Sequence, residues 1–290
     1  MRLNTTPARL YLIENSHPGT KENMSDPFQK HKEPEEIFLP LSNKQYAEFY
    51  SIEMEDFVQD IQFYQDHCKN GSRILELGCG TGRISRALSS CGCPVTGLDI
   101  SFFMLLQARK QSRNPPWYVC MDMTKMSLNM LYDHILIPYN TLNLLKEISA
   151  ITRCLQQAKT YLEPGGSLLL QIHIPDKQLL DLNGGKLFQF QTFSLAKPRS
   201  GKLIKETLRS YHSRQQEIRL EERYRVRPEG NIMGKEDLSH ILYLAAFSVQ
   251  QWIDLLQDNG FPKLSFFGDY NSRPFLEGQD SMLLINAQVS

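Results

Sequence analysis

Five residues in the first third of the chain have the types and spacing of a nucleotide-binding site. Gly78, Gly80 and Gly82 are two positions apart, Glu76 precedes the first of them, and Asp99 follows 21 positions after Gly78. Glycine has no Cβ and tolerates positive φ, so these glycines let the backbone approach a ligand closely. A carboxylate at the end of the following strand can accept both hydroxyls of a ribose. The set therefore predicts a site for a ribose-containing ligand.

Glu76 and the glycine spacing indicate which ligand this is. The pattern is G-x-G-x-G, because Arg83 occupies the position where the dinucleotide fingerprint has its last glycine. A carboxylate beside the turn would repel a pyrophosphate and attract a ligand that carries an amine and a sulfonium. These features disfavour a nicotinamide oxidoreductase. A glycine turn of purely structural use is the other interpretation, but it leaves the spacing of Asp99 unexplained.

The elements that must position these residues have the pattern of an open α/β sheet. Apolar runs predict buried strands, and they alternate with helical patterns. Strands are expected at 73–77, 94–100, 117–120, 134–137, 167–173, 264–270 and 282–287, and helices at 43–68, 102–113, 147–161 and 252–259. Within 176–230 three stretches alternate polar with apolar side chains, which is typical of half-buried antiparallel strands. This segment is expected to form an inserted sheet.

Glu76, the glycines and Asp99 together resemble motif I and the acidic loop of the class I S-adenosylmethionine-dependent methyltransferases of small-molecule type. The resemblance spans about residues 45–288. It implies an α/β fold with a Rossmann-like, doubly wound seven-stranded sheet that has one antiparallel strand, to which this chain adds the inserted sheet and an N-terminal helical arm. The expected divisions are a flexible arm at 1–42, the cofactor-binding core at 43–175, a substrate-covering insertion at 176–230 and the rest of the core sheet at 231–290.

The resemblance also implies that S-adenosylmethionine is the co-substrate. Asp122 and Met123, after the third strand, would present an acid to the adenine amino group and an apolar side chain to its ring. Tyr50 would cover the cofactor from an N-terminal helix, although a helix simply packed on the sheet explains most of its aromatic neighbours equally well. The implied cofactor-binding residues are Tyr50, Glu76, Gly78, Cys79, Gly80, Gly82, Arg83, Asp99, Ile100, Asp122, Met123, Pro138 and Tyr139.

In the resembling family the polar turn after the fourth strand lies beside the transferable methyl group. Methyl transfer is an in-line displacement with a neutral leaving group, so the enzyme contributes mainly by positioning the reacting atoms. A base is needed only when the acceptor arrives protonated. Tyr139, Asn140 and His173 are the catalytic candidates. A histidine at the end of a strand is also commonly a hydrogen-bonded structural residue, so a structural role is the alternative interpretation of His173.

Composition excludes several classes of partner. The 290 residues carry 32 basic and 32 acidic side chains, so no net field attracts nucleic acid or an anionic membrane. No apolar run reaches the length of a membrane span, and the N-terminus lacks a signal-peptide core. A cytoplasmic protein with no nucleic-acid or membrane partner is expected. The six cysteines include only one close pair, Cys91 and Cys93. A structural zinc site usually needs two such pairs, so reduced thiols and no metal are expected.

Three alternatives to a small-molecule methyltransferase stay open. A protein or RNA methyltransferase would share the cofactor, but the neutral charge disfavours it. The sequence Asn114-Pro115-Pro116-Trp117 mimics a signature of nucleobase methyltransferases, yet it precedes the third strand instead of following the fourth. A regulatory protein could retain the cofactor site without activity. The nicotinamide oxidoreductase is the most distant alternative.

The segment between Lys197 and Arg227 holds ten basic side chains against four acidic ones. One interpretation is a solvated sheet face. The other follows from the resembling family, in which this segment roofs the acceptor pocket. Alternation along the strands would then direct some arginines, with Arg209, Arg223 and Arg225 as the candidates, toward a carboxylate or phosphate. On that basis a small, acidic methyl acceptor is expected.

Overall fold

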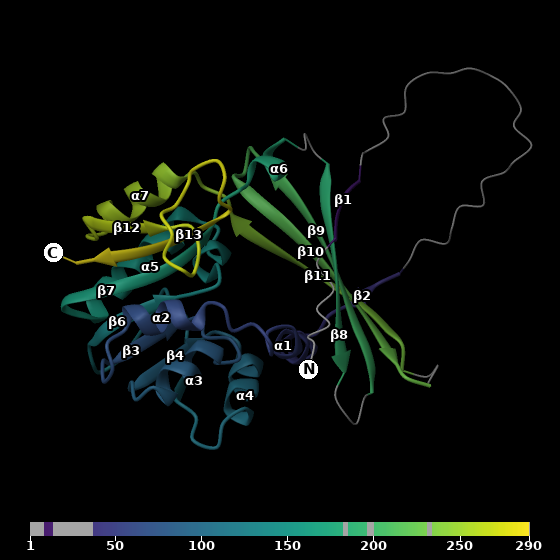
Figure 1. The fold of residues 1–290 in the computed structure, drawn as a ribbon, viewed down its shortest axis with the longest axis horizontal. Helices are drawn as coiled ribbons and strands as arrows, with labels where there is room; N and C mark the ends of the chain where they lie inside the picture. Colours follow the sequence, from purple (N-terminus) through teal and green to yellow (C-terminus); the bar gives the residue numbers. More distant parts are fainter. Residues whose placement is uncertain (1–8, 14–36, 182–184, 196–199, 231–233, 290) are drawn as a thin grey trace, which may run out of the picture.

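The glycine turn lies at the carboxyl edge of a seven-stranded sheet in the computed structural model (Figure 1). The structure describes residues 9–13, 37–181, 185–195, 200–230 and 234–289. The strand order is β12-β13-β7-β6-β3-β4-β5. The strands are β3 (Ile74–Leu77), β4 (Val95–Asp99), β5 (Trp117–Cys120), β6 (Tyr132–Ile137), β7 (Leu162–His173), β12 (Lys263–Phe267) and β13 (Met282–Gln288).

Strand directions confirm the predicted Rossmann-like sheet. Strands β3 to β7 pair in parallel, and β13 is antiparallel to both β7 and β12. β7 begins at Leu162, earlier than expected, and its register with β6 shifts between Tyr132 and His134. The chain order reverses between β3 and β6. Open α/β sheets bind ligands outside the carboxyl ends of their strands at such a switch point.

Helices cover both faces of this sheet because its strands are apolar on both sides. Leu168 and Leu170 of β7 pack into a core with α5 and α7, in which Trp252 is fully buried. Leu169 points to the other face, where it joins α2 and α3. The helices of the core are α2 (Ile61–His67), α3 (Arg83–Ser90), α4 (Phe102–Lys110), α5 (Ile148–Tyr161) and α7 (Val249–Asp258).

The predicted inserted sheet is confirmed as a second sheet of six strands within the described residues, in the order β1-β8-β9-β10-β11-β2. β8 (Lys186–Leu195), β9 (Gly201–His212), β10 (Glu217–Pro228) and β11 (Glu236–Ala245) pair antiparallel. The sheet thus continues past residue 230, where the sequence places the return to the core. β2 (Leu39–Pro40) pairs in parallel with β11.

Helix α1 (Asn43–Glu53) lies between the two sheets (Figure 1). It starts at a capping box. The Ser42 hydroxyl accepts a hydrogen bond from the Gln45 backbone N–H, and the Gln45 side-chain oxygen accepts one from the Ser42 backbone N–H. Phe49 packs against Tyr224 of β10, with ring centroids 5.2 Å apart. On the core side, Ser51 accepts from Gln111 just after α4 at 2.5 Å. A second short helix, α6 (Lys177–Leu180), packs on the other end of the sheet through Leu179.

Most of the predicted N-terminal arm at 1–42 lies outside the described residues. Within it, β1 (Arg9–Ile13) pairs antiparallel with β8. Among the helices that the structure describes, none is long and apolar enough to cross a membrane.

Candidate active site

The glycine turn has the backbone conformation that its sequence predicts. The φ angles are 68° at Gly78, 53° at Gly80 and 71° at Gly82. Residues other than glycine rarely adopt this backbone conformation. A Cβ on Gly78 would overlap the Thr141 methyl, and one on Gly82 would overlap the Tyr118 hydroxyl. A Cβ on Gly80 would contact only the Tyr50 ring, at 3.5 Å. Gly80 is therefore the point of the turn that a ligand can approach.

Asp99 ties the turn to the end of β4. Its Oδ2 accepts from the Gly80 N–H at 2.8 Å, and its Oδ1 accepts from the Ser101 N–H at 2.7 Å. Burial raises the pKa of this carboxyl above its usual value, although the two backbone bonds oppose the shift. Each carboxylate oxygen still has a lone pair for another donor. Ile100 is 75% exposed beside it, an apolar side chain that a flat ligand could cover.

Glu76 is buried directly below the turn, with 2% of its surface exposed. It accepts a hydrogen bond from the Ser85 hydroxyl. Burial raises its pKa to about 7, against the opposing effects of Ser85 and Arg83. A cationic ligand above the turn would compensate the charge of this carboxylate.

Arg83 is committed to a partner inside the protein. Its Nη1 and Nη2 lie 2.5 and 2.6 Å from the two oxygens of Asp60, a carboxylate with no exposed surface. The guanidinium also lies over the Phe57 ring, 4.9 Å from its centroid. The pair fixes the segment between α1 and α2 against α3.

The corner after β6 faces the glycine turn across the switch point. Tyr139 and Asn140 follow the buried Pro138 and have φ of 52° and 61°. For residues other than glycine this conformation costs about 1–3 kcal/mol each, and such residues often cluster at functional sites. The Asn140 side chain accepts from Gln171 at 3.3 Å, and Gln171 accepts from the Tyr270 hydroxyl at 2.9 Å. The Asn140 amide is thereby held in one orientation.

Tyr139 extends outward from this corner and is 40% exposed. Its ring meets Phe57 edge to face at 5.6 Å. Burial raises the pKa of both Tyr139 and Tyr50, so both hydroxyls stay protonated at neutral pH. Tyr50 thus lies beside Gly80, and Tyr139 packs with Phe57 at the corner after β6.

His173 lies at the end of β7 beside this corner. Burial, and then the charge of Arg209, lower its pKa to about 4, so the ring is neutral at physiological pH. Its backbone is clamped by the fully buried Asn143, which accepts from the His173 N–H at 3.0 Å and donates to the His173 carbonyl at 3.0 Å. Asn143 also donates to the Ala245 carbonyl at 2.7 Å and so joins the core to the second sheet.

The remaining predicted residues lie along the same edge. Asp122 accepts from the backbone and hydroxyl of Thr124, both at 2.8 Å, and these bonds lower its pKa. Met123 packs partly against the core, and Cys79 is buried behind the turn. The structure thus brings the predicted residues to the carboxyl edge of one sheet, while their roles stay predictions.

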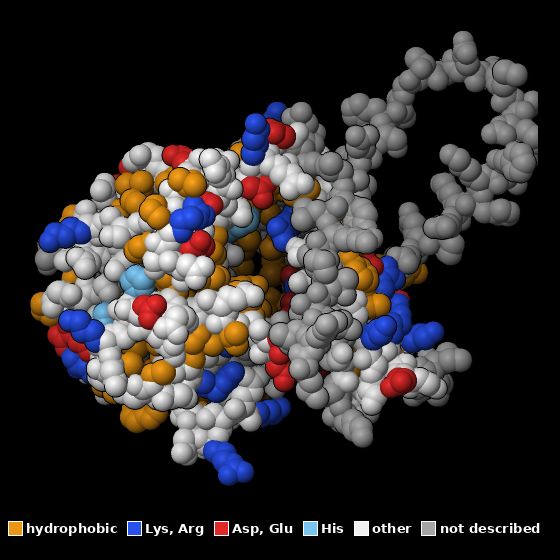
Figure 2. Space-filling model, in the orientation of Figure 1, with side chains coloured by type: hydrophobic (Ala, Val, Ile, Leu, Met, Phe, Trp, Pro, Cys, Tyr) orange, Lys and Arg blue, Asp and Glu red, His pale blue; other side chains and the backbone are white. Residues whose placement is uncertain are grey.

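The sequence did not reveal the inner face of the second sheet, which faces this edge. Register places Arg209 of β9 beside Leu220, Thr207 beside Glu222, and Glu222 beside His240 of β11. These polar side chains form a band between two apolar clusters, one on α1 and one on α6. Figure 2 shows a hollow beside the core with hydrophobic side chains on its floor and charged ones at its edge. The sequence feature that could have revealed this face is the presence of charged residues among apolar ones in 203–226.

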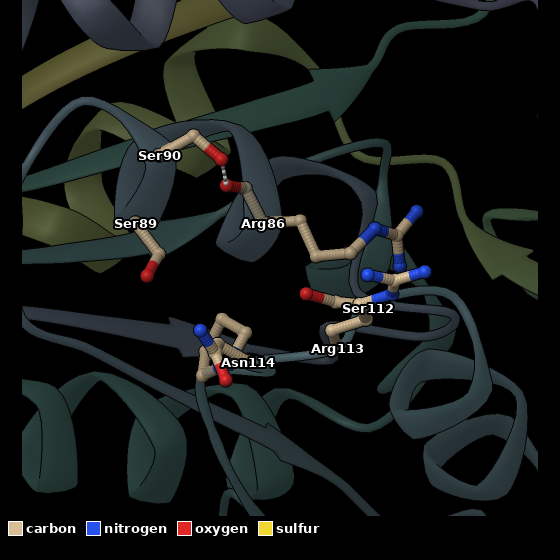
Figure 3. Close-up of a pocket in the computed structure, with 7 residues that line it drawn as sticks. Arg86, Ser89, Ser90, Ser112, Arg113 and Asn114 are labelled. Carbon is tan, nitrogen blue, oxygen red and sulfur yellow. Dashed lines mark hydrogen bonds between the residues drawn. The ribbon is translucent and has the colours of Figure 1, made fainter.

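A separate pocket, drawn in Figure 3, lies behind α3. It is lined by Arg86, Ser89 and Ser90 of that helix and by Ser112, Arg113, Asn114 and Pro116 after α4. The sequence Asn114-Pro115-Pro116 therefore lies in the loop before β5. The glycine turn and Asp99 lie at the opposite ends of the strands, so this pocket is not part of the candidate site. Among the described residues no group of side chains could hold a metal ion.

Comparison with known proteins identifies the core. Residues 74–166 match a family model described as "Methyltransferase domain". The putative methyltransferase YqeM of Bacillus subtilis is 31% identical over 133 residues, 42% of this chain and 54% of its own length. Demethylmenaquinone methyltransferase of Tropheryma whipplei is 33% identical over 125 residues, 39% of this chain and 49% of its own length. The chain spans about half the length of these curated relatives.

Solved structures extend the likeness to the fold of almost the whole chain. An S-adenosylmethionine-dependent methyltransferase from Clostridium acetobutylicum has a TM-score of 0.66 at 15% identity, covering 85% of this chain and 98% of its own. The sugar N-methyltransferase KedS8 from Streptoalloteichus has a TM-score of 0.65 at 16% identity, covering 96% of this chain and 100% of its own. Residues 74–166 thus match a methyltransferase domain, and the fold around them is that of solved S-adenosylmethionine-dependent methyltransferases.

Proposed function

We propose that the chain transfers the methyl group of S-adenosylmethionine to a small-molecule acceptor. The observation that carries this proposal is the arrangement at the switch point, where Gly80 is open to a ligand and Asp99 and Glu76 flank it. When bound, S-adenosylmethionine supplies an electrophilic methyl group on a sulfonium. The residues of the chain have to hold it and exclude water.

Each part of this ligand has a fitting partner along the edge. The free lone pairs of Asp99 suit the ribose hydroxyls, and the exposed Ile100 suits the adenine ring. Glu76 is a buried carboxylate that lacks a cation at hydrogen-bonding distance among the described residues, which suits the amino group of the methionine part. The Tyr50 and Tyr139 rings could favour the sulfonium by cation–π attraction of about 1 kcal/mol.

The acceptor is proposed to carry an anionic group that binds Arg209. The other arginine candidates are already paired on the outer face: Arg223 lies 2.6 Å from Glu221, and Arg225 lies 2.8 Å from Glu206. Arg209 points to the inner face and donates to the Gln189 amide. No carboxylate of the described residues lies within ion-pair distance of it. Burial lowers its pKa, and a carboxylate or phosphate would relieve that penalty.

A protein or RNA methyltransferase and an inactive cofactor-binding protein are the rival functions. The hollow lies under a sheet whose inner face is largely buried, which favours a small acceptor over a polymer. Sugar N-methyltransferases of the same fold, such as KedS8, are consistent with a small acceptor.

Calorimetry with the purified protein tests the cofactor half of the proposal. S-adenosylmethionine and S-adenosylhomocysteine should bind, and NAD should not. Mass spectrometry of the protein as purified should detect either of the two sulfur ligands if one co-purifies. Binding of NAD in preference to both would refute the assignment.

A further inference from the structure

The pocket behind α3 takes no part in the proposed function. It has a volume of about 380 Å³ and lies between the end of α3 and the loop that leads to β5. Arg86 and Arg113 line it together with three serines, and none of its described lining residues is acidic. Figure 3 shows the side chains of both arginines ending on the same side of the pocket. A concave site with two guanidinium groups and several hydroxyl groups favours an anion.

The chain around this pocket is basic, although the protein as a whole carries no net charge. Segments 77–98 and 100–121 contain no Asp or Glu, and Asp99 between them lies at the other end of β4. The five basic residues of the two segments are Arg83, Arg86, Arg109, Lys110 and Arg113. A local excess of one charge sign creates a potential that attracts ions of the opposite sign.

Three of these five cations have another explanation. Arg83 pairs with Asp60. Arg109 and Lys110 lie in the last turn of α4, where a positive charge interacts favourably with the helix dipole. Arg86 and Arg113 form no ion pair with any described residue. The two cations that line the pocket are therefore available to a ligand.

The pocket also offers neutral hydrogen-bond donors. The hydroxyl of Ser90 is used, since it donates to the Arg86 carbonyl at 2.8 Å. The hydroxyls of Ser89 and Ser112 make no hydrogen bond with any described residue. A phosphate group has three strong acceptor oxygens, and arginine binds two of them at once. Two arginines and two free hydroxyls match a phosphate better than a carboxylate, which has only two oxygens.

Arg86 has a second task that decides which residue should be changed in a test. Its Nη1 donates to the Thr81 carbonyl within the glycine turn. Burial raises the pKa of Tyr118, whose hydroxyl contacts Gly82, and the charge of Arg86 opposes that rise. A change at Arg86 would therefore disturb the cofactor turn as well as the pocket. Arg113 is exposed and makes no hydrogen bond with a described residue, so its replacement tests the pocket alone.

We propose that this pocket binds a phosphate group, as the free ion or as part of a small metabolite. Arg86 and Arg113 hold the phosphate oxygens, and the hydroxyls of Ser89 and Ser112 complete the donors. The pocket is a second site, so the proposal does not depend on methyl transfer. Nucleic acids bind through extended basic surfaces, whereas here the free cations are confined to one pocket of a neutral chain, which favours a small ligand.

Calorimetric titration with sodium phosphate at constant ionic strength tests the site. The wild type should bind one phosphate per chain with a saturable heat. Arg113→Gln should weaken binding by about tenfold or more, because a charge-assisted bidentate contact is lost. Arg113→Lys keeps the charge without the planar fork and should bind with intermediate affinity.

Lys110→Gln is the matched control. It removes the same charge from an exposed side chain three positions away that does not line the pocket. Its phosphate affinity should stay within about twofold of wild type at physiological salt, which screens exposed charges. An equal loss in Lys110→Gln and Arg113→Gln would mean that general charge attracts the ion, and this result would overturn the proposal.

Two further probes identify the source of the phosphate and the class of ligand. Glycerol 3-phosphate is titrated beside inorganic phosphate: tighter binding of the ester assigns a phosphorylated metabolite, and tighter binding of phosphate assigns the free ion. A single-stranded RNA oligonucleotide is the third probe. Stronger binding of RNA than of both small probes, lost in Arg113→Gln, would overturn the small-ligand class.

The remaining outcomes decide whether a site exists. Absence of saturable phosphate binding to the wild type, or equal binding by Arg113→Gln, would overturn the proposal. These titrations contain no cofactor, so neither result bears on the proposed methyl transfer.

Discussion

Glu76 allows the positive charge of the ligand to be detected from the protons that binding releases. Burial raises the pKa of this side chain from 4.5 to about 7, so the ionised form is disfavoured by roughly 3 kcal/mol. An ammonium group placed beside the carboxylate would favour ionisation. If the methionine part of the cofactor binds there, a protonated Glu76 must lose its proton.

The expected release follows from that pKa. At pH 6 the free protein holds about 0.9 of a proton on Glu76, and at pH 8 about 0.1. Calorimetric titration of S-adenosylhomocysteine in phosphate and in Tris, whose ionisation enthalpies differ, measures the number of protons that binding releases. Nearly one proton should be released at pH 6 and almost none at pH 8, and Glu76→Gln should release none at either pH.

The same shift predicts the stability of the free protein. The pKa of Glu76 is higher in the folded protein than in the unfolded chain. The stability that Glu76 contributes to the folded state is therefore complete below about pH 4.5 and is lost as pH rises through 7. Glu76→Gln should therefore gain stability relative to wild type by up to roughly 3 kcal/mol at pH 8. Tight binding at pH 6 with no proton release would refute the placement of the ligand's cation beside Glu76.

Three further changes test separate parts of the site. Asp99→Ala should weaken S-adenosylhomocysteine binding by about 1–3 kcal/mol, since ribose hydroxyls would be left unpaired; unchanged affinity would refute its role. Asp60→Asn leaves a buried guanidinium unpaired and should cost about 3–5 kcal/mol in chemical denaturation, whereas Asp133→Asn, at a half-exposed pair, should cost under about 1 kcal/mol. Asn140→Ala should reduce turnover more than His173→Ala, because burial lowers the pKa of His173 to about 4 and makes it a weak base; a large loss at His173 alone, rescued at high pH, would make it a base instead.

The core and the cofactor turn were predictable because their signals are local. An apolar run, three glycines and the acid that ends the next strand lie within 30 residues, and the strand pairing follows from the alternation of strands with helices. β11 was missed because Glu236, Asp237, Ser239 and His240 interrupt its apolar pattern. Only its pairing with β10, from Glu236 to Ala245, makes it a strand.

The contacts between α1 and the second sheet could not be predicted for a different reason. Glu53 and Lys205 are 152 positions apart and meet only because α1 packs under the second sheet. The basic stretch of the sequence spans β9 and β10 but does not show which of its residues lie on which face. A shift of one residue exchanges the two faces of a strand, so the observed register was needed to separate Arg209 from Arg223 and Arg225.

The central claim is that this chain moves a methyl group from S-adenosylmethionine to a small molecule. The most direct test supplies cofactor labelled with deuterium in the methyl group together with a metabolite extract, and follows the label by mass spectrometry. The account predicts S-adenosylhomocysteine and a labelled small molecule in equal amounts, with less of both formed by Asp99→Ala when the cofactor is not saturating. Bound cofactor without turnover, or label found only in protein or RNA, would contradict it.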